Sequence, residues 1–363
     1  MNFDLSEEQE LFRSSVERFS APIDVEARRK LRLSPTGYDR ERWTQLAELG
    51  LIALAASEEA GGMGGSSIDL ALVAEAIGKA NSPDPWLEHG AIPAMLLGAG
   101  GAEDILEKVV SGEQVAALAW AERSQRYSLK PANMKAQQTS EGFALSGEKT
   151  FVMGALLADI FIVTADLNGE VAMFLVPKDT PGLEVRAYRL TDGSIAGELK
   201  LTQVALNSET LLDTADQETL ELIVAEARLY AAAEMVGLGQ RLLDDTLTYI
   251  KEREQFGVAI GSFQALQHRM VDCYAKLEQC RSMLYRAALT KRDDYPALIR
   301  GAAGAKAFIG ENVDAIAREA VQMHGGMGIT DELAIGHAMK RVMVLARLFG
   351  DTDTVLAEYA IAA

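Results

Sequence analysis

The chain has 363 residues, and its 53 acidic residues outnumber its 35 Lys and Arg residues, which gives a formal net charge of −18. Hydrophobic residues make up 48% and charged residues 24%, a balance that indicates a folded protein with a large core and excludes a disordered or fibrous one. The acidic charge argues against a nucleic-acid-binding protein, because such a protein needs a basic face for the phosphate backbone.

Residues 1–115 are expected to form a helical domain. Ser6-Glu7-Glu8-Gln9 is a capping-box pattern, in which the hydroxyl and the amide bind free N–H groups at the start of a helix. Further helices fit residues 41–54 and 67–80, and a glycine cluster at 61–65 lies between them. No strand precedes this cluster and no Lys-Ser/Thr follows it, so we interpret it as a turn rather than a phosphate loop.

Residues 116–215 are expected to form strands. Short apolar runs such as 160–163 and 171–176 are bounded by turn residues, including Asn168-Gly169 and Pro181-Gly182. The spacing of these runs predicts a central antiparallel β domain, folded as a small barrel or a sandwich.

Residues 216–363 are expected to be helical. Helices fit residues 217–252, 262–291 and 297–323. Long helices that follow one another through short loops favour an antiparallel bundle.

The compartment is predicted from the cysteines and the apolar runs. Cys273 and Cys280 fall in one expected helix, roughly 10 Å apart, which is too far for a disulfide. We therefore expect buried thiols in a reducing compartment. The opening residues lack the basic and apolar regions of a signal peptide, and no apolar run reaches the ~18–20 residues that span a bilayer. The expectation is a cytoplasmic protein that does not enter a membrane.

Two polar segments could carry chemistry. Arg253-Glu254-Gln255-Phe256-Gly257 ends one long helix and Gln264 opens the next, so a cation, amides and an aromatic ring meet at a helix corner. This corner could grip a pyrophosphate and a ring, or it could be a polar corner with a buried phenylalanine. Gln322-Met323-His324-Gly325-Gly326 ends another helix, and its glycines permit either the close approach of a ligand or a simple helix stop. From the residues alone, both alternatives stay open.

Taken together in this domain order, the two segments resemble signatures of the acyl-CoA dehydrogenase family. Three other regions extend the resemblance over essentially the whole chain, namely Asp4-Leu5-Ser6-Glu7-Glu8-Gln9, Glu58-Glu59-Ala60-Gly61-Gly62-Met63-Gly64 and Gly147-Glu148-Lys149-Thr150-Phe151 with Ala158-Asp159. The resemblance implies an α+β fold with an N-terminal helical domain at 1–115, a central antiparallel β domain at 116–215 and a C-terminal four-helix bundle at 216–363.

The resemblance also implies an oxidoreductase that uses FAD. A carboxylate base would remove the proton from Cα of an acyl-CoA thioester, while the hydrogen on Cβ leaves as hydride to flavin N5. The expected acyl group is bulky, branched, carboxylated or of steroid type, as in fatty acid or steroid degradation. An electron-transferring flavoprotein is the expected electron acceptor. The four histidines have no metal-ligand spacing, so no metal is expected.

Individual residues take roles from the same resemblance. The FAD of an adjacent subunit would be contacted by Arg253, Gln255 and Phe256, an arrangement that requires at least a dimer. The other cofactor contacts that it implies are Gln264, Gln322, Gly325, Gly326, Phe151 and Thr352. Arg228 and Phe349 would contact the substrate, although Arg228 could instead pair with a neighbouring acid such as Glu226.

The customary catalytic glutamates of the family are missing. Many members carry the base in a Tyr-Glu-Gly-Thr segment, where this chain has Phe349-Gly350-Asp351-Thr352. Other members carry it on the long helix, at the position of Ala227. Asp351 could be the base if the backbone shifts by one residue, or it could cap the final helix. Glu122 and Glu226 are weaker candidates for the base.

The flavin-ring side of the expected site departs from the family as well. Ala121 and Met153 replace hydroxyl residues, and Phe151 replaces a tryptophan, whereas the part offered to a neighbouring subunit is preserved. The chain could therefore be an active homo-oligomer, or a catalytically weak or non-catalytic subunit of a heterotetramer with a related dehydrogenase subunit. The ending Phe349-Gly350-Asp351 resembles the smaller subunits of two-component acyl-CoA dehydrogenases. A third alternative is a flavin oxidase that uses Asp351 on a non-thioester substrate.

Overall fold

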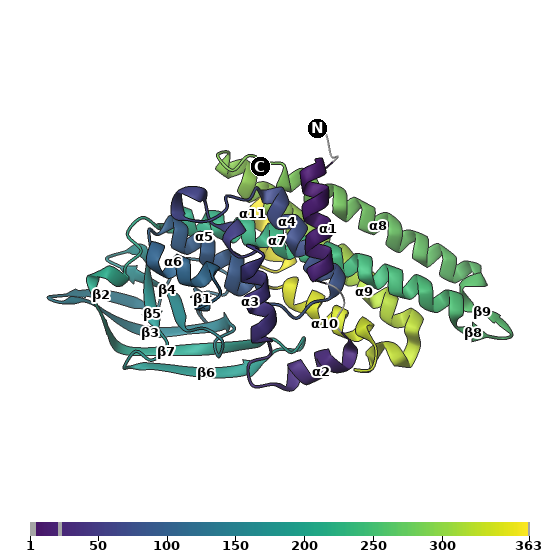
Figure 1. Cartoon of the computed structure of the whole chain (residues 1–363), viewed down its shortest axis with the longest axis horizontal. Coiled ribbons are helices and arrows are strands. Elements are labelled where there is room, and N and C mark those ends of the chain that lie inside the picture. The colour runs from purple at the N-terminus through teal and green to yellow at the C-terminus, as the bar shows by residue number, and fades with distance from the viewer. Residues whose placement is uncertain (1–4, 21–23, 362–363) are drawn as a thin grey trace. The chain divides into compact units, whose positions relative to one another are not determined.

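The structure is a computed structural model that describes residues 5–20 and 24–361 (Figure 1). The chain forms two compact units, each assembled from separate stretches of sequence. The bundle unit, as we name it, comprises Met1–Leu31, Ser66–Pro83 and Arg228–Ala363, and the sheet unit comprises Arg32–Gly65 and Asp84–Ala227. The three domains predicted from the sequence, with boundaries near 115 and 215, stay a prediction.

The sheet unit combines short helices with one seven-stranded sheet. Its helices are α3 (Arg40–Glu48), the π-helical turn Trp86–Ala91, α5 (Ile92–Ala99) and α6 (Glu103–Val110). Its strands are β1 (Ala116–Ala119), β2 (Lys135–Thr139), β3 (Gly142–Met153), β4 (Ile160–Leu167), β5 (Glu170–Pro177), β6 (Leu183–Arg189) and β7 (Ile195–Leu206). The strand order is β1-β4-β2-β3-β7-β6, and β5 also pairs with β4.

The expectation of a wholly antiparallel sheet is wrong for two pairings. Both β1 and β2 run parallel to β4, whereas the other described pairings are antiparallel. A tight turn enforces an antiparallel pair, as at Asn168 and Gly169 between β4 and β5, where both residues have positive φ. Other strands separate β1 from β4 along the chain, so no short turn fixes their direction.

In its described residues, the bundle unit is helical except for one small hairpin. Its helices are α1 (Glu7–Phe19), α4 (Ser67–Ala80), α8 (Gln264–Ala288), α9 (Tyr295–His324), α10 (Ala334–Leu345) and α11 (Thr352–Ile361), together with most of α2 (Val25–Leu33) and of α7 (Gln217–Glu252). The hairpin joins β8 (Glu254–Gln255) to β9 (Val258–Ala259) between α7 and α8. Figure 1 shows α8 and α9 running side by side toward this end of the unit.

Two glycines let α4 and α7 cross backbone against backbone. A Cβ atom on Gly78 would lie 2.0 Å from the carbonyl oxygen of Glu234, and one on Gly237 would lie 2.0 Å from that of Glu75. Real Cβ atoms do not approach so closely, so only glycine fits at either position. The crossing fixes the separation of the two helices that carry Glu75 and Glu234.

The long helices confirm the sequence predictions, and shorter elements correct them. Residues 67–80 and 217–252 are helical with the expected bounds. The capping box at Ser6 is also present, although Asp4 of the opening motif lies outside the described residues. The helix expected over 41–54 is wrong beyond Glu48, because the chain turns at Gly50 with φ +72°. Helices α2, α5 and α6 and the π-helical turn were not expected.

Candidate cofactor and active sites

The β8–β9 hairpin presents an aromatic ring to solvent. Phe256 is 94% exposed, and its backbone has a φ of +54°, which a non-glycine residue rarely adopts. Its ring touches only the edge of Phe263 among the described aromatic contacts, with centroids 6.3 Å apart. Arg253 and Gln255 beside it are also exposed. The alternative of a buried phenylalanine at this corner is therefore wrong.

The end of α9 lies beside the end of α7. His324 stacks on Tyr249 with ring centroids 4.2 Å apart and contacts the carbonyl oxygen of Ala320 through Nδ1 (2.8 Å). Gly325 follows with a φ of +60°, and a Cβ atom on Gly325 or Gly326 would meet nothing within 4 Å. The backbone at these two glycines is open to the approach of another molecule.

The two segments thus meet at one end of the bundle unit. We call this group the hairpin cluster, and its members are Arg253, Gln255, Phe256, Gln264, Gln322, Gly325 and Gly326. All seven are exposed. A guanidinium group beside glycines that leave room for close approach suits a pyrophosphate, and an aromatic face suits a planar ring. The chemistry of these residues fits a dinucleotide cofactor.

A second group surrounds the start of α11, and Arg228 of α7 is one of its members. The Nε atom of Arg228 donates to the carbonyl oxygen of Phe349 (2.8 Å), and both terminal nitrogens bind the carboxylate of Glu358 on α11, Nη2 at 3.0 Å. The side chain of Arg228 is only 6% exposed. The acid that pairs with Arg228 is Glu358 of α11, which lies 130 residues further along the chain.

Lys306 of α9 binds the same segment. Its Nζ atom donates to the carbonyl oxygens of Ala346 (3.1 Å) and Gly350 (3.2 Å), and the residue is only 2% exposed. Burial lowers the pKa of Lys306 to about 7, and the positive charge of Arg228 acts in the same direction while Asp351 opposes it. Sequence reasoning missed Lys306, although a lysine in an alanine-rich helix face was a signal.

Asp351 caps α11. Its Oδ1 atom accepts hydrogen bonds from the backbone N–H of Thr354 (3.0 Å) and from its hydroxyl group (2.7 Å). This is the capping alternative considered from the sequence. We call Arg228, Lys306, Phe349, Gly350, Asp351, Thr352 and Glu358 the α11 cluster.

The two clusters lie far apart along α7. Arg228 and Glu252 are 24 positions apart in this continuous 36-residue helix. At 1.5 Å per residue, the separation is about 36 Å. The site residues that the sequence predicts in the bundle unit therefore form two groups that do not touch one another.

Phe151 belongs to the sheet unit, on β3. It has a φ of +54° and lies where the register of β3 against β7 shifts, between Lys149 and Val152. The backbone N–H of Thr150 donates to the carbonyl oxygen of Ala121 (2.8 Å), so the segments that carry Phe151 and Ala121 are joined.

A buried ion pair holds the same region. Lys149 Nζ binds Glu122 Oε1 (3.0 Å), the carbonyl oxygen of Trp120 (3.0 Å) and the hydroxyl of Thr164 (2.9 Å). Glu122 also accepts three backbone N–H groups, from Ala132, Asn133 and Met134. Burial opposes its ionisation, but the N–H groups and Lys149 outweigh burial and lower the pKa of Glu122. These contacts give Glu122 a structural role.

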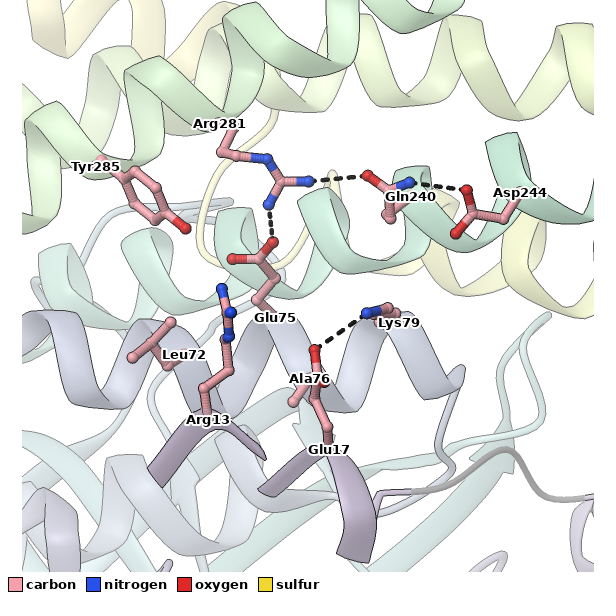
Figure 2. Close-up of a pocket in the computed structure, with 10 residues that line it drawn as sticks. All are labelled: Arg13, Glu17, Leu72, Glu75, Ala76, Lys79, Gln240, Asp244, Arg281 and Tyr285. Carbon is pink, nitrogen blue, oxygen red and sulfur yellow. Dashed lines mark hydrogen bonds and ion pairs between the residues drawn. The ribbon is translucent and has the colours of Figure 1, made fainter. Parts of the chain in front are cut away.

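Figure 2 shows a separate pocket of about 380 Å³ in the bundle unit, between α1, α4, α7 and α8. Arg281 binds the carboxylate of Glu75 and the side-chain oxygen of Gln240 (2.9 Å). Lys79 binds Glu17 (3.1 Å). The charges of the pocket are largely paired with one another, and none of the sequence-derived site residues lines it.

Membrane-spanning helices and metal-binding groups are absent from the described ranges. No helix in residues 5–20 or 24–361 is long and apolar enough to cross a membrane. In the same part of the chain, no group of histidine, cysteine or acidic side chains could hold a metal ion. Cys273 and Cys280 are buried free thiols, as expected.

Comparisons with known proteins place the chain in a family. Models of the N-terminal, middle and C-terminal domains of acyl-CoA dehydrogenase match residues 6–113, 117–204 and 220–360. The acyl-CoA dehydrogenase IpdE2 of Mycolicibacterium smegmatis is 32% identical over 356 residues, which cover 95% of this chain and 96% of that protein.

Two solved structures share the fold over nearly their whole length. The ChsE4-ChsE5 complex from Mycobacterium tuberculosis matches with a TM-score of 0.89 and 26% identity, covering 99% of this chain and 98% of the other. PigA with FAD and proline matches with a TM-score of 0.90 and 28% identity, again covering 99% and 98%.

The fold and the exposed cofactor-type residues define a flavin-dependent oxidoreductase. The chain belongs to the acyl-CoA dehydrogenase family, and its cofactor is FAD.

Proposed function

We propose that the protein catalyses α,β-dehydrogenation of an acyl-CoA thioester, as an assembly of at least two chains in which each chain serves two FAD sites. The proposed acyl group is bulky, branched, carboxylated or of steroid type, as the ending Phe349-Gly350-Asp351 suggests by its resemblance to smaller subunits of two-component enzymes. The proposed electron acceptor is an electron-transferring flavoprotein.

The observation that carries this proposal is the separation of the two clusters. A distance of about 36 Å along α7 is too long for Arg228 and the hairpin to contact the same reacting atoms. The hairpin also exposes Phe256 and Arg253 to solvent. Both facts agree with a hairpin that reaches the cofactor held by a second chain.

In this proposal, the chain's own residues bind the cofactor and accept the proton of the substrate. Arg253 and the open backbone at Gly325 and Gly326 would hold the pyrophosphate, and Phe256 would cover a ring. Asp351, oriented by Thr354, would take the proton from Cα of the substrate. FAD, when bound, supplies the acceptor for the hydride that leaves Cβ.

Complementation between two inactive variants tests the sharing of sites. Asp351→Asn keeps a capping side chain, because Asn caps helices as well as Asp does, but it removes the base. The pair Arg253→Ala/Phe256→Ser disables the hairpin. We expect each variant alone to be inactive. Coexpression in equal amounts should restore about a quarter of wild-type turnover, since half of randomly formed dimers are mixed and each has one intact site.

Two outcomes would contradict the proposal in different ways. Retained turnover in Asp351→Asn alone would remove Asp351 as the base. Inactivity of the mixture, with both variants folded and oligomeric, would show that Asp351 and the hairpin must belong to one chain. A parallel mixture of wild type with the hairpin variant controls for loss of assembly.

A second candidate function is a partner subunit with little activity of its own. It is favoured by the hydrogen bonds of Asp351 to Thr354, which weaken a carboxylate as a base, and by Ala121 and Met153 on the expected flavin-ring side. The similarity to a complex that contains two named components agrees with it.

The visible spectrum of the purified chain separates the two candidates. About one FAD per chain together with turnover supports the active homo-oligomer. A colourless protein that stays colourless when FAD is added supports the partner subunit, and it should then gain colour only with a related dehydrogenase chain.

A further inference from the structure

Two buried basic side chains bind the segment before α11. Lys306 binds the carbonyl oxygens of Ala346 and Gly350, and Arg228 binds that of Phe349. Phe349 has a φ of +61°, which a non-glycine residue rarely adopts on its own, whereas the φ of +130° at Gly350 is open to glycine. The cations therefore determine where the segment, and Asp351 after it, lies.

Lys306 acts directly on the residue before Asp351. Its contact with Gly350 is to the carbonyl group of the peptide that links Gly350 to Asp351. Its second contact, with Ala346, is at the C-terminal cap of α10, where the carbonyl groups favour a positive charge. Since Lys306 is only 2% exposed, water screens little of its charge from neighbouring groups.

The charged groups around Lys306 come from each element packed on it. Arg228 on α7 and Arg347 after α10 disfavour its positive charge, and Asp351 favours it. Glu358 on α11 reaches this group through its ion pair with Arg228. The lysine is thus the group in this cluster that gains or loses a proton near neutral pH, with its pKa at about 7.

We propose that Lys306 is a positioning residue for Asp351: it fixes the Gly350–Asp351 peptide, and the charge on its amine sets the proton affinity of the Asp351 carboxylate. This inference rests on the proposed function, in which Asp351 is the catalytic base. Protonated Lys306 makes Asp351 a weaker base, and neutral Lys306 makes it a stronger one. The site then works better above the titration of Lys306 than below it.

The first test observes Asp351 directly and needs no turnover. The protein is labelled with ¹³C at the carboxyl carbon of aspartate, and the Asp351 signal is assigned from its loss in Asp351→Asn. Between pH 6 and 8, where an ordinary aspartate is already ionised, we expect a second inflection in this signal. It should vanish in Lys306→Met and persist in Lys340→Met, which removes a lysine of α10 that pairs with Asp331 instead.

The second test measures how fast the enzyme exchanges the α-proton of an acyl-CoA for solvent deuterium, with FAD present. If the neutral state of Lys306 allows about tenfold faster exchange than the charged state, wild type should exchange about fivefold faster at pH 8 than at pH 6, because a lysine with a pKa of about 7 is only partly converted between these two pH values. Lys306→Met should lose this step. Lys306→Arg, which stays charged, should remain at the low-pH rate across the range.

The outcomes keep this inference apart from the proposed function. An Asp351 signal without an inflection near pH 7, or with one that survives in Lys306→Met, overturns the inference even if Asp351→Asn is inactive. An inflection that depends on Lys306 in a protein that exchanges no proton supports the inference and overturns Asp351 as the base. The wild-type titration gives its answer even if a Lys306 variant does not fold.

Discussion

Arg228 Nε donates a 2.8 Å hydrogen bond to the carbonyl oxygen of Phe349, which lies 121 residues further along the chain. The same guanidinium group binds Glu358 with its two terminal nitrogens. A planar guanidinium is suited to binding a carboxylate and a carbonyl group at once, because its donors point in fixed directions. Arg228 therefore joins α7 both to the segment before α11 and to Glu358 in the second half of α11, and its proposed contact with substrate would come in addition.

Replacing Arg228 should cost more stability than replacing its partner. Arg228→Met leaves the carbonyl group of Phe349 and the carboxylate of Glu358 without this donor, so we expect a loss of about 2–3 kcal/mol in urea denaturation. Glu358→Gln should cost about 1 kcal/mol or less, because the side chain of Glu358 is 38% exposed. Equal losses in the two variants would contradict this account.

The buried Lys149–Glu122 pair should be essential in the sheet unit. Lys149→Met leaves an ionised carboxylate buried at 1% exposure, so we expect the free energy of unfolding to fall by about 3–5 kcal/mol. The matched control is Lys135→Met, which breaks the exposed pair with Asp166 and should cost less than about 1 kcal/mol. Both are measured by urea denaturation at pH 7, and similar losses would show that burial does not matter here.

Two glycine-to-alanine variants should separate packing from cofactor binding. Gly237→Ala places a methyl group 2.0 Å from the carbonyl oxygen of Glu75, so α4 and α7 must move apart at a cost of about 3 kcal/mol or more. Gly326→Ala meets nothing within 4 Å and should change stability by less than about 0.5 kcal/mol. If the FAD pyrophosphate approaches Gly326, titration of the apoprotein should show about tenfold weaker FAD binding in Gly326→Ala. Unchanged FAD affinity would remove Gly326 from the cofactor site.

We expect the β8–β9 hairpin to contribute to FAD binding in the assembly and not to the stability of the folded chain. Phe256→Ser removes a side chain that is 94% exposed, so the thermal midpoint of FAD-free protein should not change. We expect lower FAD occupancy after purification, read from the ratio of visible to ultraviolet absorbance. Leu11→Ser, at a side chain that is 71% exposed on α1, is the control and should leave both values unchanged. A large drop in thermal midpoint for Phe256→Ser alone would indicate packing within the chain.

The free energy of unfolding should depend on pH through the titration of buried Lys306. The pKa of Lys306 is lowered to about 7 from a model-compound value of 10.5, so the unfolded chain binds more protons than the folded chain between these two pH values. Stability from this group is therefore present at high pH and is lost as the pH falls toward 7.

Comparison with Lys306→Met isolates this contribution, since methionine does not titrate. Between pH 7 and 9.5 the wild type should gain up to about 3 kcal/mol relative to the variant, as measured by urea denaturation at each pH. A constant difference across this range would mean that Lys306 keeps its proton in the folded protein.

Much of the candidate site followed from local sequence. The segment Arg253–Phe256 was expected at a helix corner because the helical pattern stops there, and the glycines after Gln322 were expected at a helix end. For Lys306 the local sequence showed only a lysine among alanines and not its partners, because Ala346 and Gly350 contribute backbone groups about 40 residues away. The role of Asp351 also stayed open in the sequence, since a cap and a base have the same residue type.

The sequence by itself determined the long helices and the family to which the chain belongs. Helix bounds at 67–80 and 217–252 follow from apolar periodicity and capping residues, which act over a few positions. Only the tertiary structure decided that β1 and β2 run parallel to β4, that Arg228 binds Glu358, and that the α11 cluster lies about 36 Å along α7 from the hairpin. These relationships join residues that are distant in the chain, and packing in three dimensions, not local spacing, selects such partners.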